Sequence, residues 1–241
     1  MPKQKPLRVD IITIFPELVE PYLQGSILGR GQKAGALELK AHALRQWTTD
    51  RHQTVDDRPF GGGPGMVMKV EPFHKALMAL KLRKKDGSKT ATAKKTCVLL
   101  TSAKGRPFSQ QEAVRLSQYE RLVFLCGRYE GVDERLVEHL VDEEVSVGPY
   151  VLTGGELAAM IVTDAVSRLR PGVLGKMESL AQESHTEEGL LEYPQYTRPE
   201  VYKAGKEKWG IPEILLSGDH KKIEAWRKGM MKGDGGKQNK N

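Results

Sequence analysis

The chain has 241 residues, 39% of them hydrophobic and 29% charged, which suits a globular protein with one large domain and a smaller appendage. Its formal net charge of +7 favours a polyanionic partner, because lysines and arginines that neutralise phosphates release bound counterions. No apolar run approaches the ~20 residues that a membrane helix needs, and the first apolar run is short and contains Asp10, unlike a signal peptide. We therefore expect a cytoplasmic protein without a membrane partner.

Only two cysteines occur, Cys97 and Cys126, without CxxC spacing, which argues against a disulfide framework and a structural zinc site. Each cysteine lies in an apolar, strand-like run. We expect a small buried thiol at both positions.

Strand-like and helix-like segments alternate along the first half of the chain. The predicted elements, in chain order, are a strand at about 8–14, a helical stretch near 16–32, a strand at 37–43, a helix at 70–84, a strand at 96–101, a helix beginning near Ser109 and a strand at 121–126. This alternation predicts an α/β fold with a mostly parallel sheet covered by helices.

The second half is less regular. A helix is predicted over 154–169, and weak periodicity with many Gly, Pro, Ser and Glu residues predicts a long interdomain loop over 170–212. Asp219 is expected to cap a final helix. In the helix at 154–169, the predicted apolar face consists of Leu157, Met160, Ile161, Ala165 and Leu169. In the final helix it consists of Ile223, Trp226 and Met230.

A basic run covers residues 81–95, with seven basic residues against one acid, Asp86. Such a run is either a solvated loop or a contact surface for a polyanion. Composition alone leaves both interpretations open.

Three glycine-containing loops, 101–106, 126–131 and 147–155, follow strand-like segments. Ligands of open parallel sheets bind beyond the carboxyl ends of the strands, and glycine lets the backbone approach a ligand closely. Neither GxGxxG after the first strand nor GxxxxGK[ST] occurs, which disfavours phosphate cradles of the NAD and ATP type. The loops predict a pocket for a planar ligand without phosphates.

A fourth loop, 55–66, holds four glycines and two prolines beside Asp56, Asp57 and Arg58. It is either a plain surface turn or a shaped functional loop. The glycine content favours function.

Six segments together resemble those of a known family. They are IITIFPE, DRHQTVDDRPFGGGPGM, CGRYEGVDER, VGPYVLTGGELAAM, DAVSRLRPGVLG and EGLLEYPQYTRPEV. Over about residues 8–227 the chain resembles the TrmD family of bacterial tRNA (guanine-N1) methyltransferases. The resemblance implies a SPOUT-type parallel sheet with a carboxyl-terminal trefoil knot, an exception to the rule against threaded chains, and a short helical C-terminal appendage. The implied domains are a knotted methyltransferase domain at 1–169, an interdomain loop at 170–190 and a reduced tRNA-contacting domain with a basic tail at 191–241.

The resemblance also implies the reaction, which is S-adenosylmethionine-dependent methylation of N1 of guanosine 37 in tRNA, beside the anticodon. Proteins of the SPOUT class act as homodimers whose active sites are shared between subunits. The implied partners are therefore the anticodon stem-loop and a second copy of the chain. No recognisable motif would bind Mg²⁺, and a magnesium requirement stays open.

The implied donor-binding residues lie in the three glycine-containing loops. They are Leu100, Thr101, Ser102, Gly127, Glu130, Val147, Gly148, Pro149, Tyr150, Val151, Leu152, Gly154 and Gly155. Glu130 would balance the sulfonium charge of the donor, the alternative being a solvated loop acid. For Tyr150 the alternative is a core aromatic.

Arg168 matches the family's essential arginine, and its guanidinium would stabilise the charge that develops on guanine O6 when N1 loses its proton. Asp164 stands four residues earlier and would hold Arg168, the alternative being a surface ion pair worth less than ~1 kcal/mol. The implied general base is Glu183, where the family has an aspartate, with Glu178 and His185 as alternatives. In this family the base comes from the partner subunit.

The resemblance assigns the target guanosine to the glycine-rich loop, since an unstacked base can be read on its Watson–Crick edge. The implied substrate-binding residues are Asp56, Arg58, Gly61, Gly62, Gly63, Pro64 and Gly65.

The sequence departs from the family pattern in three places. Leu100 and Ala103 replace a common tyrosine and proline of the first donor loop, and the segment 203–210 is a few residues longer. The chain ends soon after Arg227, where relatives continue into further helices. We therefore expect tRNA affinity to depend on the basic run 81–95 and on further basic residues, namely Lys221, Lys222, Arg227 and Lys228.

Two alternatives remain. One is a related SPOUT enzyme that modifies a ribose or a different base atom, and the other is a non-catalytic RNA-binding module. Loss of 1-methylguanosine from the tRNA of a deletion strain distinguishes the first, and the absence of donor binding in calorimetry would favour the second.

Overall fold

The computed structural model describes residues 5–174 and 191–231. The chain forms two compact units, Met1–Gly175 (unit 1) and Lys176–Asn241 (unit 2). Each unit is described by itself below.

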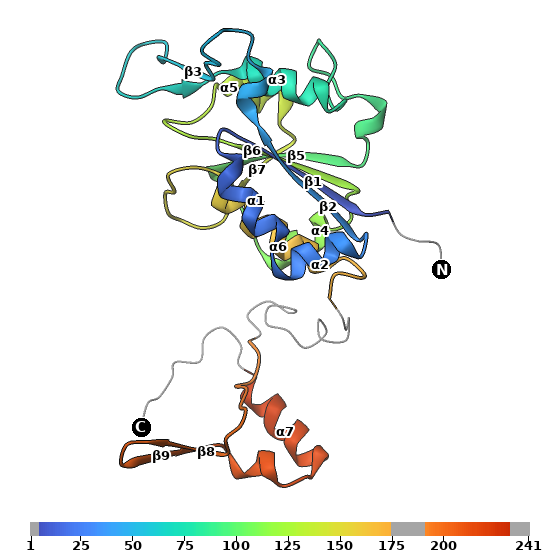
Figure 1. Ribbon diagram of the computed structural model, residues 1–241, viewed down its shortest axis with the longest axis vertical. Helices are drawn as coiled ribbons and strands as arrows, with labels where there is room; N and C mark the ends of the chain where they lie inside the picture. The colour runs from blue at the N-terminus through green and yellow to red at the C-terminus, as the bar shows by residue number, and fades with distance from the viewer. Residues whose placement is uncertain (1–4, 175–190, 232–241) are drawn as a thin grey trace. The chain divides into compact units, whose positions relative to one another are not determined.

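Unit 1 is built on a five-stranded sheet in the order β2-β1-β6-β5-β7, in which all neighbours are parallel (Figure 1). The strands are β1 (Leu7–Thr13), β2 (Leu37–Ala43), β5 (Thr96–Pro107), β6 (Arg121–Cys126) and β7 (Glu143–Ser146). The predicted parallel α/β sheet and its first four strands are confirmed. The edge strand β7 is only four residues long and was not predicted.

Helices cover both faces of this sheet, as Figure 1 shows. On one face lie α1 (Pro16–Gln24), α2 (Ser26–Lys33), α4 (Gln110–Leu116) and α6 (Glu156–Ser167); on the other lie α3 (Val70–Ala79) and α5 (Glu134–Leu140), with the 3-10 turns η1 (Leu44–Trp47) and η2 (Ala91–Ala93). The Ser109 side chain accepts a hydrogen bond from the Glu112 amide, as an N-cap does. The predicted start of α4 is therefore confirmed.

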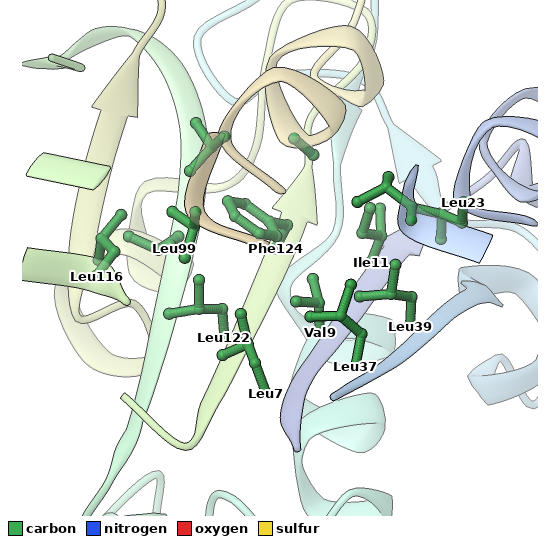
Figure 2. Packing of buried hydrophobic residues seen from close by; sticks show 14 of the residues in the cluster. Leu7, Val9, Ile11, Leu23, Leu37, Leu39, Leu99, Leu116, Leu122 and Phe124 are labelled. Carbon is green, nitrogen blue, oxygen red and sulfur yellow. The ribbon is translucent and has the colours of Figure 1, made fainter. Parts of the chain in front are cut away.

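Alternate residues of each strand enter different cores. Along β6, Leu122 and Phe124 belong to the cluster shown in Figure 2, whereas Val123 and Leu125 belong to the cluster beneath α3 and α5. Successive side chains of a strand point to opposite faces, and both faces here are covered. This explains why the inner strands β5 and β6 are nearly continuous apolar runs, whereas the edge strand β2 alternates apolar residues with the exposed Glu38 and Lys40.

The predicted apolar face of α6 is confirmed for Met160, Ala165 and Leu169, which pack against the core, but is wrong for two of its residues. Leu157 and Ile161 are 56% and 47% exposed, whereas the small residues Ala159 and Thr163 are fully buried. The helix is apolar nearly all round, so its sequence fits two different stripes. Small side chains face inward because they let the helix lie close to the sheet.

The basic run 81–95 is partly structural. Helix α3 ends at Ala79 rather than 84, and Lys81 adopts a left-handed conformation with φ of 61°. Arg83 is buried and donates from Nη2 to the Leu140 carbonyl and to Asp142 Oδ1, both at 2.7 Å. Lys89 forms an ion pair with the same carboxylate at 2.9 Å. Both residues attach the segment to the connection between α5 and β7.

Unit 2 contains the hairpin β8 (Val201–Ala204) and β9 (Glu207–Gly210), the turn η4 (Glu213–Leu216) and helix α7 (His220–Met230). The prediction of a long interdomain loop over 170–212 is therefore wrong for the hairpin at 201–210. Asp219 caps α7 by accepting from the Lys222 amide, as predicted. The ring of Trp226 contacts that of Tyr196, with centroids 6.5 Å apart.

Both cysteines are free and buried, as expected. Burial raises the pKa of the Cys97 thiol to about 12 and raises the pKa of Cys126 well above its ordinary value. Among the residues described, no helix is long and apolar enough to cross a membrane.

Candidate functional site

A cavity of about 290 Å³ opens where β5, β6 and β7 end. Its walls come from the loop that interrupts β5, the loop after β6 and the loop between β7 and α6. Pairing between β5 and β7 shifts register between Thr101 and Arg106, so residues 102–105 bulge out of the ladder. The cavity thus lies at the carboxyl edge of the sheet, where parallel sheets bind ligands.

The structure brings together twelve of the thirteen residues that the resemblance assigns to the donor. Pro149 is the exception, since it does not line the cavity. Those on the wall are Leu100, Thr101, Ser102, Gly127, Glu130, Val147, Gly148, Tyr150, Val151, Leu152, Gly154 and Gly155. Tyr150 is exposed rather than in the core, and its hydroxyl donates to the Val147 carbonyl at 3.1 Å.

Two adjacent glycines allow the loops to meet. A Cβ on Gly155 would lie 1.9 Å from Thr101 Oγ1 and 3.0 Å from the Cα of Cys126. A Cβ on Gly154 would lie 2.2 Å from Nε of Arg128. The Gly155 amide also donates to the Gly127 carbonyl at 3.0 Å. Larger residues would push the third loop away from the other two.

A buried network that sequence reasoning missed lies behind this wall. Glu156 is only 2% exposed, and its carboxylate accepts from Thr13 Oγ1 at 2.5 Å and from Arg128 Nε at 3.0 and 3.2 Å. The Arg128 guanidinium also lies 4.8 Å from the centroid of the Phe15 ring. The network ties the loop after β6 to the start of α6. An acid directly after two glycines at a helix start was the available signal.

The cavity wall carries more acids than bases. Glu130, Glu134 and Glu144 line it, against Lys104 and Arg128. Because Arg128 is paired with the buried Glu156, the wall presents an excess of negative charge to a ligand.

The glycine-rich loop is attached to the same wall. It connects β3 (Asp56–Asp57) to β4 (Val67–Met68), and β4 pairs with the loop after β6 through the Met68 amide and the Gly131 carbonyl at 3.0 Å. Gly65 lies against Glu130, whose Oε1 would be 2.3 Å from an added Cβ. The remaining glycines of the loop have positive φ and open space around them. They are Gly61, Gly62 and Gly63.

Among the predicted substrate residues, Gly65 lies against Glu130 of the wall, and the others stand elsewhere in the loop or in β3. Asp56 opens the short strand β3, and Arg58 is exposed, its amide donating to Asp57 Oδ1 at 2.9 Å. Pro64 lies in the exposed part of the loop.

Arg168 stands at the opposite end of α6 from the cavity. Ten residues separate it from Ala158, the residue farthest along α6 that lines the cavity, which at 1.5 Å per residue is about 15 Å, beyond the reach of one arginine side chain. Its amide donates to the Asp164 carbonyl at 3.1 Å, and the Asp164 carboxylate accepts from the Tyr22 hydroxyl. This bond is the main reason that the pKa of Tyr22 is raised. One chain therefore does not bring Arg168 to its own cavity.

The predicted base, Glu183, and its alternatives, Glu178 and His185, lie outside the described residues. In the ranges 5–174 and 191–231, no group of three or more His, Cys, Asp or Glu side chains is arranged to hold a metal ion.

The chain matches the family model described as tRNA (Guanine-1)-methyltransferase TrmD over residues 7–239. It is 50% identical to the tRNA (guanine-N(1)-)-methyltransferase of Halorhodospira halophila, over 91% of this chain and 78% of that protein. The proteins of the same description from Geobacter sp. and Pseudomonas putida are 51% and 48% identical, each over 92% of this chain and over 84% and 83% of their own lengths. By both measures, the chain belongs to the TrmD family of tRNA (guanine-N1)-methyltransferases.

Proposed function

We propose that this protein methylates N1 of guanosine 37 in tRNA with S-adenosylmethionine as the donor, in the cavity at the ends of β5, β6 and β7. The observation that carries the proposal is that three loops distant in the sequence, which the family resemblance assigns to the donor, form one wall of a single cavity.

The wall suits this donor in shape and charge. The close approach of Gly154 and Gly155 to neighbouring loops leaves backbone groups, rather than side chains, at the edge of the cavity. The acids Glu130, Glu134 and Glu144 would attract a sulfonium cation. When bound, S-adenosylmethionine supplies an electrophilic methyl group. The chain supplies the geometry and the proton acceptor.

The acceptor nitrogen needs two groups from the chain. N1 of guanine is a poor nucleophile while it carries its proton, so a carboxylate, which we assign to Glu183, removes it. The guanidinium of Arg168 stabilises the negative charge that then develops on O6. Because Arg168 is about 15 Å along α6 from Ala158 in the cavity wall of its own chain, we assign it to the cavity of a partner subunit.

An exposed apolar face supports this assignment to a homodimer. Leu18 and Tyr22 on α1 are 54% and 48% exposed, beside Leu157 and Ile161 on the neighbouring helix α6. Exposed apolar groups on adjacent helices are typical of a covered surface. We propose that a second copy of the chain covers this face. Because Arg168 is on the same helix as Leu157 and Ile161, such a dimer would bring Arg168 of one subunit to the cavity of the other.

Analytical ultracentrifugation tests the homodimer. Ile161→Glu puts a charge in the proposed interface and should give monomers without methyl transfer. Leu216→Glu, at a similarly exposed leucine of unit 2, is the control and should leave the dimer intact. A wild-type protein that sediments as a monomer at micromolar concentration while turning over would contradict the shared site.

The finer assignments of fold and location belong to the same proposal. We assign the loops around the cavity to a trefoil knot, unit 2 to tRNA contact, and the protein to the cytoplasm. The domain division proposed is 1–169, 170–190 and 191–241. Addition of EDTA to the assay decides whether Mg²⁺ takes part.

Nucleoside mass spectrometry tests the reaction directly. Purified protein, S-adenosylmethionine and a tRNA transcript with guanosine at positions 36 and 37 should yield 1-methylguanosine, and a transcript with adenosine at position 37 should not. A 2′-O-methylated nucleoside, or methylation at another position, would contradict the proposal. Glu183→Gln should be severely impaired. If Glu178→Gln is inactive instead, the base is Glu178.

A further inference from the structure

The hairpin of unit 2 (residues 201–210, the aromatic hairpin) displays a pair of rings on its surface. Tyr202 and Trp209 are directly opposite each other in the antiparallel register, with ring centroids 5.6 Å apart and planes tilted by 34°. Their side chains are 55% and 58% exposed. The Trp209 indole N–H is occupied, because it donates to Glu207 Oε2 at 3.0 Å. The pair can therefore contact a partner through the faces of its rings rather than through the indole N–H.

The same hairpin also carries lysines. Lys203 and Lys208 are also paired in register, on the face opposite the rings because successive side chains alternate. Lys206 lies in the turn after Gly205, so the hairpin carries three lysines against one glutamate. Like charges placed directly opposite each other destabilise a hairpin. A partner with negative charge would offset that cost.

The rings do not serve the interior of unit 2. The ring contacts that hold α7 are those of Trp226 with Tyr196 and of Arg227 with Tyr193. The aromatic hairpin extends away from this part of unit 2 in Figure 1. It also contains the segment 203–210, which the family resemblance implies to be a few residues longer than the family pattern.

We propose that the aromatic hairpin binds an unpaired nucleotide of tRNA, with the base stacked on Trp209 and Tyr202 and the neighbouring phosphates paired with the lysines. Every base has a π face, so stacking on aromatic rings binds single-stranded nucleic acid with little sequence preference. Lysine side chains are long enough to reach around the edges of a two-stranded ribbon to the backbone of the same strand.

The size and charge of the surface favour RNA over a protein partner. A stable protein interface buries about 800 Å² on each side, more than two four-residue strands present. One or two nucleotides cover two rings. That the RNA is tRNA rests on the proposed function.

Fluorescence anisotropy of a labelled tRNA transcript with the full chain, without methyl donor, tests the proposal. We expect Tyr202→Ala/Trp209→Ala to weaken binding at least tenfold, given stacking contributions measured by alanine substitution. Tyr202→Phe/Trp209→Phe keeps two rings and should stay within about threefold of wild type. Binding of the alanine variant within twofold of wild type would overturn the proposal, as would a change in self-association instead of tRNA affinity.

A second variant separates binding from folding. Lys203→Gln/Lys208→Gln removes the like-charge pair, so it should not unfold the hairpin. It should flatten the dependence of log affinity on log salt by roughly 0.7 for each phosphate that the variant no longer neutralises. An unchanged salt slope would overturn the role of the lysines.

Failure of the reaction is distinguishable from failure of this inference, because these measurements need no methyl transfer. If the protein binds tRNA through the rings but forms no 1-methylguanosine, only the proposed function fails. If it forms 1-methylguanosine and the alanine variant binds tRNA like wild type, only the proposed role of the aromatic hairpin is contradicted.

Discussion

Units 1 and 2 differ in where their charged side chains lie. In unit 1, Asp10, Arg83 and Glu156 are buried, and each has partners at hydrogen-bond distance. In the described part of unit 2 no side chain is buried, and lysines and aromatic rings face the solvent. Buried ionic groups fix geometry, because each is costly without its partners. Unit 1 therefore suits the positioning of a small donor, and unit 2 suits contact with a large charged substrate.

Arg168→Ala should slow methyl transfer without weakening donor binding, and we expect the largest effect on kcat from this variant. We expect kcat to fall at least 100-fold, as when a group that stabilises a developing oxyanion is removed, while calorimetry shows donor affinity nearly unchanged. Arg8→Ala, which removes an exposed ion pair with Glu38, is the matched control. An Arg168→Ala enzyme that retains a tenth of wild-type kcat would exclude the assigned role.

Asp10→Asn tests the cost of disturbing a buried ionic group in unit 1. Asp10 Oδ1 lies 2.6 Å from His42 Nε2, and Oδ2 accepts from Arg121 Nε at 2.7 Å. Removing one member of a buried pair should lower the free energy of unfolding by about 3 kcal/mol at neutral pH, measured by urea unfolding.

The pH dependence sharpens that test. Burial raises the pKa of Asp10, but the hydrogen bonds and charges of His42 and Arg121 outweigh it and lower the pKa below 3.8. The unfolded state therefore binds more protons, so this stabilisation is present above the unfolded pKa and is lost as pH falls through the folded one. The stability that wild type gains over Asp10→Asn should therefore shrink as pH falls below the pKa that Asp10 has in the unfolded chain. A difference that grows toward acid would contradict the assignment.

Gly155→Ala should damage the cavity wall. Its Cβ would overlap Thr101 and approach the backbone of Cys126, and overpacking of this kind costs about 2 kcal/mol. We expect a lower melting temperature and at least tenfold weaker donor binding in calorimetry, on the basis of that cost. Donor affinity equal to wild type would mean that the wall does not contact the donor.

Gly229→Ala is the matched change in unit 2 and should have the smallest effect. Gly229 is exposed in α7, with nothing within 4 Å of an added Cβ. Alanine favours a helix over glycine by up to about 1 kcal/mol, so thermal unfolding should occur at the same or a slightly higher temperature. A clear destabilisation would show that α7 is packed more tightly than its exposure indicates.

Much of unit 1 could be predicted because β1, β5 and β6 are rich in apolar residues and the loops that form the cavity contain glycines. The face of α6 could not, since both of its stripes are apolar and only packing against the sheet selects Ala159 and Thr163. From the sequence, Arg83 is one base of a run that is either a solvated loop or a contact surface for a polyanion. Its burial depends on Leu140 and Asp142, more than fifty residues away.

The aromatic hairpin was missed because its strands have four residues each and include lysine, glycine and glutamate, which are uncommon in strands. The contact between its two rings across the strands adds stability that the strand propensity of these residues does not provide. The carboxylate of Glu156 was missed because an acid in a first helical turn is ordinarily explained by the helix dipole. Its contacts with Thr13 and Arg128 appear only once β1 and β6 are adjacent.

A crystal structure of the protein soaked with S-adenosylmethionine tests the central claim most directly. The account predicts density for the donor between the loops 100–104, 127–132 and 147–155, with backbone groups of the glycine-containing turns against it. Donor density elsewhere on the chain, or a cavity filled by the protein's own side chains, would contradict it.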